Sequence, residues 1–168
     1  MTPASLLLSA VTAERLAELW LARRNTSALL ASGAREYAPR HYRAIVLLHF
    51  LWLATLWIFG WARPLRWIWL VAFLVFQALR AWVLVTLGHR WTTRIIVLPN
   101  APLVAKGPYR LISHPNYLAV AGEIATLPLC LDLPWHTLLF SAANAVILTI
   151  RIRAEEAALV GLRHVEHA

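Results

Sequence analysis

Residues 44–61 read AIVLLHFLWLATLWIFGW, an 18-residue run in which His49 is the only ionisable side chain. A helix needs about 20 mostly apolar residues to cross the hydrocarbon core of a bilayer, so this run predicts a membrane span. The whole chain has the same character: 60% of its 168 residues are hydrophobic, 14% are charged, and the mean hydropathy is +0.61. Soluble domains have about 45–50% apolar and about 25% charged residues. The composition therefore predicts an integral membrane protein and argues against a soluble enzyme or a disordered chain.

Four further segments have a similar composition, at residues 3–21, 64–87, 117–131 and 134–150. The first carries Glu14, Arg15 and Glu18, but it lacks the basic start and the cleavage site of a signal peptide. The last two are short, and Asp132-Leu133-Pro134 joins them, with Pro134 suited to the first turn of a helix. We expect an all-α integral membrane protein with about five transmembrane helices in one domain, residues 1–168. Because Cys130 is the only cysteine, an internal disulfide and a multi-cysteine zinc site are excluded, and we expect no metal site.

The basic residues predict the orientation of these spans. Two basic residues, Arg63 and Arg66, lie between the second and third spans. Twelve basic residues follow the first, third and fifth spans and therefore lie on the opposite side: Arg23, Arg24, Arg35, Arg40, Arg43, Arg90, Arg94, Lys106, Arg110, Arg151, Arg153 and Arg163. The positive-inside rule then places the N-terminus outside and the C-terminus in the cytosol. It also explains the net charge of +8, so we expect no nucleic-acid partner.

The cytosolic segments are more than connectors. Residues 88–116 form a 29-residue loop with four prolines, and a loop of this length in a small domain is usually functional. Within it, residues 95–98 and 103–104 flank Pro99-Asn100-Ala101-Pro102 and predict a small extended turn-back. Residues 25–32 predict a short interfacial helix that Gly33 closes, with Leu29 and Leu30 reaching the lipid.

Ionisable residues within spans are costly and therefore informative. Arg80 and Glu123 lie at similar estimated depths from the cytosolic side, roughly 10 Å at a rise of 1.5 Å per residue. They are expected to pair, either as a structural clamp or as one wall of a polar pocket that binds a substrate. Glu14, Arg15 and Glu18 leave the same two alternatives open, with local pairing at i,i+3 spacing favoured.

Two motifs flank the predicted membrane hairpin. Residues 106–117 read KGPYRLISHPNY, where glycine and prolines fix a turn beside His114, and residues 151–159 read RIRAEEAAL. In the second motif Arg151, Glu155 and Leu159 share one face of a helix. On its own, the His-Pro dipeptide is weak evidence, and the second motif is better explained by a structural Arg–Glu helix pair.

Together, G-P-Y-x-x-x-x-H-P-x-Y, the hairpin and R-x-x-x-E-E-x-x-L resemble the isoprenylcysteine carboxyl methyltransferase family over residues 88–159. The resemblance implies a membrane enzyme that uses S-adenosylmethionine to methylate an oxygen of a lipophilic substrate, with residues 88–168 as the catalytic part. The cofactor-binding residues that it implies are Ala101, Pro102, Leu103, Val104, Tyr109, His114, Pro115, Asn116, Tyr117 and Glu155. The resemblance also implies that Arg151 faces a substrate carboxylate; Arg80 and Glu123, which their estimated depth brings together, complete the expected substrate-binding residues. The residues implied for catalysis are Arg151, Glu155 and His114.

This chain departs from the family pattern in two places. Ser113 stands where the family usually has arginine, and the chain ends at Ala168 without the usual F-G and spaced tyrosines. The short ending resembles small bacterial members, some of which methylate long-chain polyketide pyrones or phenols. The acceptor could therefore be a prenylcysteine carboxylate or such a phenol or enol, for which His114 or Glu155 would take the proton.

Other functions share some of these features. H-P-x-Y also occurs in phospholipid N-methyltransferases and in NADPH-dependent lipid and sterol reductases. A non-enzymatic membrane assembly protein, with basic loops on anionic lipid, is a further alternative. Because the six glycines nowhere form G-x-G, a Rossmann-type donor site is not expected.

Overall fold

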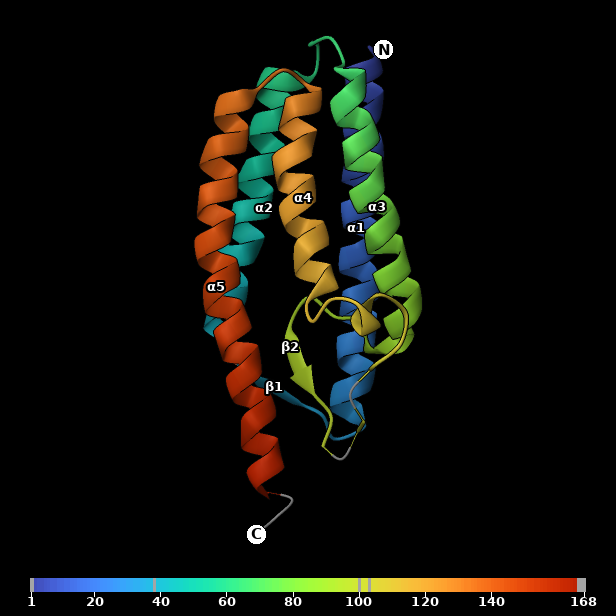
Figure 1. The fold of residues 1–168 in the computed structure, drawn as a ribbon, viewed down its shortest axis with the longest axis vertical. Helices are drawn as coiled ribbons and strands as arrows, with labels where there is room; N and C mark the ends of the chain where they lie inside the picture. Colours follow the sequence, from blue (N-terminus) through green and yellow to red (C-terminus); the bar gives the residue numbers. More distant parts are fainter. Residues whose placement is uncertain (1, 38, 100, 103, 166–168) are drawn as a thin grey trace.

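The computed structural model describes residues 2–37, 39–99, 101–102 and 104–165. Figure 1 shows a bundle of helices with a small strand pair at one end. The helices are α1 (Pro3–Ala31), α2 (Pro39–Gly60), α3 (Trp67–Leu87), α4 (Pro115–Cys130) and α5 (Pro134–Val165), with short 3-10 helices η1 (Gly88–Arg90) and η2 (Gly107–Arg110) and strands β1 (Arg35–Tyr37) and β2 (Ile95–Val97). The prediction of a helical membrane protein is confirmed.

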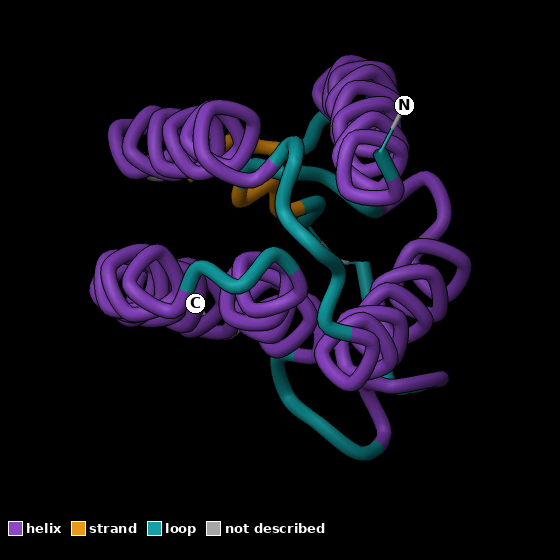
Figure 2. Tube along the Cα trace, turned by 90° about the horizontal axis from the view of Figure 1, so that it is seen from above, coloured by secondary structure: helices purple, strands orange, loops and turns teal. Residues whose placement is uncertain are grey.

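Three helices are long and apolar enough to cross a membrane, over Tyr42–Gly60, Trp67–Arg90 and Pro134–Ala158. The other two are less apolar or shorter: α1 carries three ionisable residues near its middle, and α4 has 16 residues, a length of about 24 Å. Both nevertheless lie alongside the apolar helices, α1 against α2 and α4 between α3 and α5 (Figure 1 and Figure 2). The crossing of the bilayer by all five helices stays a prediction.

The core lies around α4, which packs between α3 and α5. Ile124 and Leu127 of α4 are almost completely buried, as are Leu8 of α1 and Leu56 of α2. The outward faces of the apolar helices are also hydrophobic, for example Ile68, which is 78% exposed, and many neighbours like it. Apolar surface of this extent marks contact with lipid in a membrane protein.

The connection between α2 and α3 (residues 61–66) and the connection between α4 and α5 (residues 131–133) lie at the same end of the bundle as the N-terminus (Figure 1). The backbone N–H of Arg66 donates to the carbonyl of Cys130 at 2.8 Å, and the Arg66 guanidinium pairs with Asp132 at 3.2 Å, so the two connections are tied together. Pro134 starts α5, as predicted. Trp67 and Trp135 are more than two-thirds exposed at this end, where an aromatic belt is expected.

One prediction for the opposite end is wrong, and another is only partly tested. Strand β2 pairs with β1 in antiparallel register, Glu36 opposite Ile96. The backbone N–H of Ala101 donates to the carbonyl of Leu98 at 3.3 Å, so the chain turns where the sequence predicted; Leu103 lies outside the described residues. The separate helix at residues 25–32 does not exist, because α1 continues to Ala31. Within α1, the side chain of Leu29 is buried and does not reach the lipid, whereas Leu30 is exposed. Gly33 does end the helix in a left-handed conformation, with φ +92°.

Reporter fusions test the orientation. Because the basic residues gather at the end with the strands, a reporter fused after Ala168 should signal a cytosolic location, and one inserted at Asp132 should signal the opposite side. A fusion at the N-terminus should agree with the one at Asp132. The same signal from Ala168 and Asp132 would contradict the five-span arrangement.

Candidate functional site

The long loop is fixed to the ends of α1 and α3 that lie near the strands. The Asn25 amide, which is buried, donates to the carbonyls of Gly88 at 3.2 Å and Trp91 at 2.8 Å. Further along, Arg90 donates to the carbonyl of Pro102 at 2.8 Å. Gly107 turns the chain with φ +58°, a conformation that suits glycine. These contacts hold the loop against α1 and α3, so that the loop can form one wall of a cavity.

The first turn of α4 carries the central residues of the first motif. His114 is the N-cap residue of α4, and Pro115 occupies the first turn. The imidazole of His114 stacks on the ring of Tyr117, with centroids 5.4 Å apart. The turn therefore presents His114, Asn116 and Tyr117 toward the loop.

The Tyr117 hydroxyl links the two motifs. It accepts a hydrogen bond from Arg151 Nε at 3.0 Å and donates one to the Glu155 carboxylate. Arg151 also donates from Nη2 to the carbonyl of Thr93 at 2.7 Å and is 7% exposed. One residue, Arg151, thus connects α5 with α4 and the loop.

The loop, α4 and α5 enclose a cavity of about 490 Å³, which we call the loop cavity. Of the predicted cofactor residues, those that line it are Ala101, Pro102, Val104, Tyr109, His114, Asn116, Tyr117 and Glu155. Pro115 is buried in α4 and does not line it, and Leu103 lies outside the described residues. Two motifs that are 34 or more residues apart in sequence therefore converge on one space.

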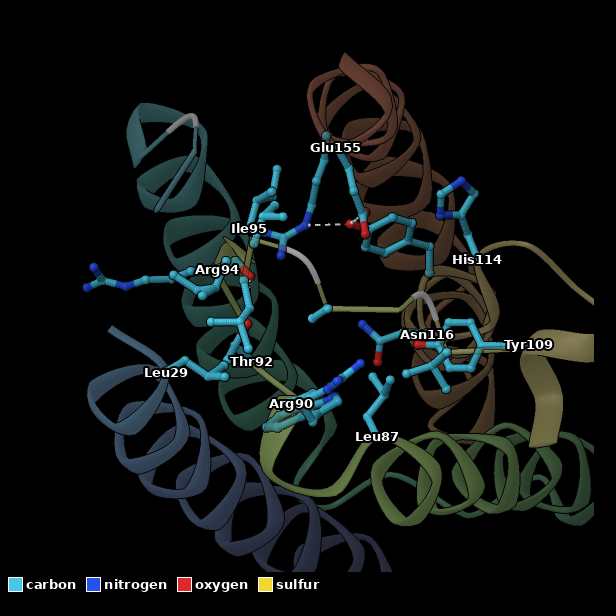
Figure 3. Close-up of a pocket in the computed structure, with 18 of the residues that line it drawn as sticks. Leu29, Leu87, Arg90, Thr92, Arg94, Ile95, Tyr109, His114, Asn116 and Glu155 are labelled. Carbon is cyan, nitrogen blue, oxygen red and sulfur yellow. Dashed lines mark hydrogen bonds between the residues drawn. The ribbon is translucent and has the colours of Figure 1, made fainter. Parts of the chain in front are cut away.

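The loop cavity has residues that the sequence did not indicate. In Figure 3 the side chains of Arg90 and Asn116 point into the cavity, whereas Arg94 points away from it. Arg94 instead pairs with Glu36 of β1 at 2.9 Å. Strand β2 supplies a further wall. A basic residue after a span has several possible roles, so only the fold could identify Arg90 as a lining residue.

The charges in the loop cavity are of both signs. Glu155 lies opposite Arg90 and beside Arg151, so a ligand with a cationic and an anionic group would find a partner for each. Burial, together with the nearby Glu155 carboxylate, raises the pKa of Tyr109 to about 12. At neutral pH Tyr109 is therefore protonated and able to donate a hydrogen bond.

A second cavity of about 280 Å³ lies deeper, among the helices, and we call it the helix cavity. Its lining is mainly apolar and comes from α1, α2, α3, α4 and α5 and from the loop. Five residues line both cavities: Trp91, Thr92, Asn116, Tyr117 and Arg151. The two cavities therefore meet at Arg151 and Tyr117.

A buried ionic cluster lies beside the helix cavity, and the predicted Arg80–Glu123 pair is confirmed. Arg80 Nε donates to Glu123 Oε1 at 2.6 Å, and a second bond joins Arg80 Nη2 to Glu123 Oε2. Arg15 and Glu18 pair at 2.8 Å, as the i,i+3 spacing predicted, and Arg15 also approaches Glu123 at 3.4 Å. Arg80 lines the cavity, whereas Glu123 lies behind it, 2% exposed.

The fold and the two converging motifs define a membrane protein in which the loop cavity adjoins the more apolar helix cavity. Residues 68–161, more than half of the chain, match the isoprenylcysteine carboxyl methyltransferase (ICMT) family, and the chain belongs to this family. The membrane methyltransferase class follows from that membership.

Two bacterial relatives extend the similarity to nearly the whole chain. Uncharacterized protein YpbQ of Bacillus subtilis is 39% identical over 160 residues, which are 92% of this chain and 95% of that protein. An uncharacterized protein of Haemophilus influenzae is 26% identical over 155 residues, 89% of this chain and 90% of that protein. No solved structure matches significantly. The protein thus has about the length of these bacterial relatives.

Proposed function

We propose that the protein transfers a methyl group from S-adenosylmethionine to an oxygen of a lipophilic acceptor. The observation that carries this proposal is the meeting of the loop cavity with the more apolar helix cavity at Arg151 and Tyr117. Methyl transfer requires a polar donor and an oily acceptor to approach each other in line. Two adjoining cavities, of which the deeper one is the more apolar, suit that requirement.

The lining of the loop cavity fits the methyl donor. Its volume of about 490 Å³ lies within the range of about 300–1,000 Å³ that is usual for small-molecule sites. The donor carries an ammonium on its amino-acid end, for which Glu155 provides the opposite charge. The aromatic and backbone groups at Tyr109 and residues 101–102 would contact the nucleoside.

The helix cavity fits a lipid-like acceptor. Leu16 of α1 and Phe50 of α2 line it and are 62% and 66% exposed, so its mouth lies between these helices on the lipid-facing surface. An acceptor could then enter sideways from the membrane while the donor enters from the cytosol. Arg151, at the junction, would orient the reacting oxygen.

The donor supplies an electrophilic methyl group on a cationic sulfur. The protein needs mainly to position the reactants and exclude water. Correct orientation of the reactants can by itself lower the activation barrier by roughly 7–11 kcal/mol. An acceptor carboxylate is already ionised at neutral pH, and Arg151 would hold it through its planar donors. A phenol or enol would pass its proton to His114 or Glu155.

Thermal unfolding in detergent tests the donor. S-adenosylmethionine or its demethylated product, at a hundredfold excess over its dissociation constant, should raise the melting temperature by about 5 °C or more. NADPH should leave it unchanged. Stabilisation by NADPH alone would identify a reductase, and stabilisation by none of the three would favour an assembly protein.

A further inference from the structure

The helix cavity contains buried polar atoms that have no partner within the protein. In the described part of the chain, six buried side-chain polar atoms lack a hydrogen-bond partner, and five belong to residues that line this cavity. They are Arg15 Nε, Trp52 Nε1, Trp91 Nε1, Asn116 Oδ1 and Asn144 Oδ1. Because buried polar groups are normally paired, their gathering around one cavity points to a ligand.

Two of these residues lie far from the junction of the cavities. Asn144 is 2% exposed and lies two turns before Arg151 on α5, which is roughly 10 Å deeper in the bundle. Trp52 is 3% exposed and comes from α2, which packs against α5. Trp52 offers an N–H donor and Asn144 an oxygen acceptor. This part of the cavity is therefore equipped for a group that is separate from the reacting oxygen.

His49 adds a second acceptor. Its Nδ1 lies 2.9 Å from the carbonyl of Ile45, and since a carbonyl only accepts, Nδ1 carries the proton. In the neutral ring Nε2 then has a free lone pair. The ring stands edge-on to Trp52, with centroids 6.4 Å apart, and both residues line the cavity. We call His49, Trp52 and Asn144 the polar layer.

We propose that the polar layer recognises a second, uncharged polar group on the acceptor, an amide or a hydroxyl, which accepts from Trp52 and donates to Asn144 or His49. The inference rests on the proposed function, since it takes the helix cavity as the acceptor site. It adds that a hydrocarbon tail with a single terminal oxygen group is a poor occupant. A polar group inside the tail would satisfy donors and acceptors that otherwise stay unpaired in the membrane interior.

Matched amphiphiles test the inference without the methyl donor. The probes are N-dodecanoyl-aminohexanoate, whose amide lies well away from its carboxylate, and a saturated fatty acid of the same chain length. Their affinities are measured by displacement of a dansyl-labelled fatty acid from the protein in nanodiscs, with empty nanodiscs correcting for partitioning. The amide probe should bind about tenfold or more tightly than the fatty acid, as expected for two hydrogen bonds.

The variants Asn144→Leu and Trp52→Phe should remove most of that preference. Thr149→Val is the control, because it removes a hydroxyl from the lipid-facing side of the same helix. Asn144→Leu should also keep or raise the melting temperature of the free protein, since an unpaired buried amide is replaced by an apolar group. Equal affinity for the two probes, including no binding of either, would overturn the inference, as would a melting temperature of Asn144→Leu several degrees below wild type.

The two proposals fail separately. The probe experiment contains no S-adenosylmethionine, so loss of the amide preference leaves donor binding to be judged by its own thermal shift. Conversely, if S-adenosylmethionine does not change the melting temperature, the preference of the helix cavity for the amide probe over the fatty acid can still be measured.

Discussion

Replacing Glu155 with glutamine is expected to weaken binding of S-adenosylmethionine about 5- to 150-fold. This corresponds to the loss of about 1–3 kcal/mol for a charge-assisted contact. Glutamine keeps the size of the side chain and can still accept from the Tyr117 hydroxyl, so the loss would report the charge. Calorimetric titration of the donor into each variant measures it.

The neighbouring residue provides the control. Glu156→Gln makes the same chemical change one position along α5, at a side chain that is 61% exposed, does not line the loop cavity, and makes only a long 3.7 Å contact with His114. Its donor affinity should equal that of wild type. Equal affinities of Glu155→Gln and wild type would reject the role of Glu155 and leave the family similarity for the fold alone.

Substitution of Arg151 should reduce methyl transfer and leave donor binding nearly unchanged. Arg151→Ala would impair transfer more than donor binding, but it would also free the carbonyl of Thr93, so Arg151→Lys is the cleaner variant. Lysine keeps the charge but lacks the planar fork that can hold Tyr117, Thr93 and an acceptor oxygen together. We expect donor affinity within about threefold of wild type and a loss of transfer of about a hundredfold, since misplacement by about 1 Å can cost that much. The rate of transfer is measured with S-adenosylmethionine that carries a tritiated methyl group, as the radioactivity that appears in an organic extract of the membranes.

The second large effect concerns Arg80 and Glu123. Arg80→Met or Glu123→Leu alone should lower the free energy of unfolding by about 3–5 kcal/mol, because each leaves a buried charge without its main partner. The double variant should lose less than either single one, since Arg15 and Glu18 still pair with each other. Unfolding in mixed micelles measures the cycle.

A surface pair is the control for this cycle. Arg66 and Asp132 have a similar two-bond geometry, but their side chains are 57% and 44% exposed. Arg66→Met should therefore cost at most about 1 kcal/mol. Losses at Arg80 and Glu123 that simply add up would mean that the two residues stabilise the bundle independently.

The sequence predicted those features that depend on local pattern or on depth in the membrane. Apolar runs gave the spans of α2, α3 and α5, and counting residues from the span ends brought Arg80 and Glu123 together. The motif residues His114, Tyr117 and Glu155 were indicated by the family resemblance, because local pattern alone was consistent with a structural role.

Contacts between distant segments could not be predicted in the same way. Strand β1 has three residues, Arg-Glu-Tyr, whose partner in β2 is about 60 residues away, and nothing local marks so short a strand. The end of α1 was also misjudged, because Asn25 suggested a helix start. Its amide instead bonds to the loop carbonyls from within a continuous helix. Tertiary contacts here outweighed local preference.

The central claim is that the loop cavity binds the methyl donor, and photolabelling tests it most directly. The protein is irradiated with S-adenosylmethionine that carries an azide on its adenine, and the labelled peptides are mapped by mass spectrometry. We predict labelling within residues 87–117 or 151–155, suppressed by excess unlabelled donor and reduced in Glu155→Gln but not in Glu156→Gln. Labelling confined to the helix-cavity segments of α1 and α2, or labelling that excess donor does not suppress, would contradict the claim.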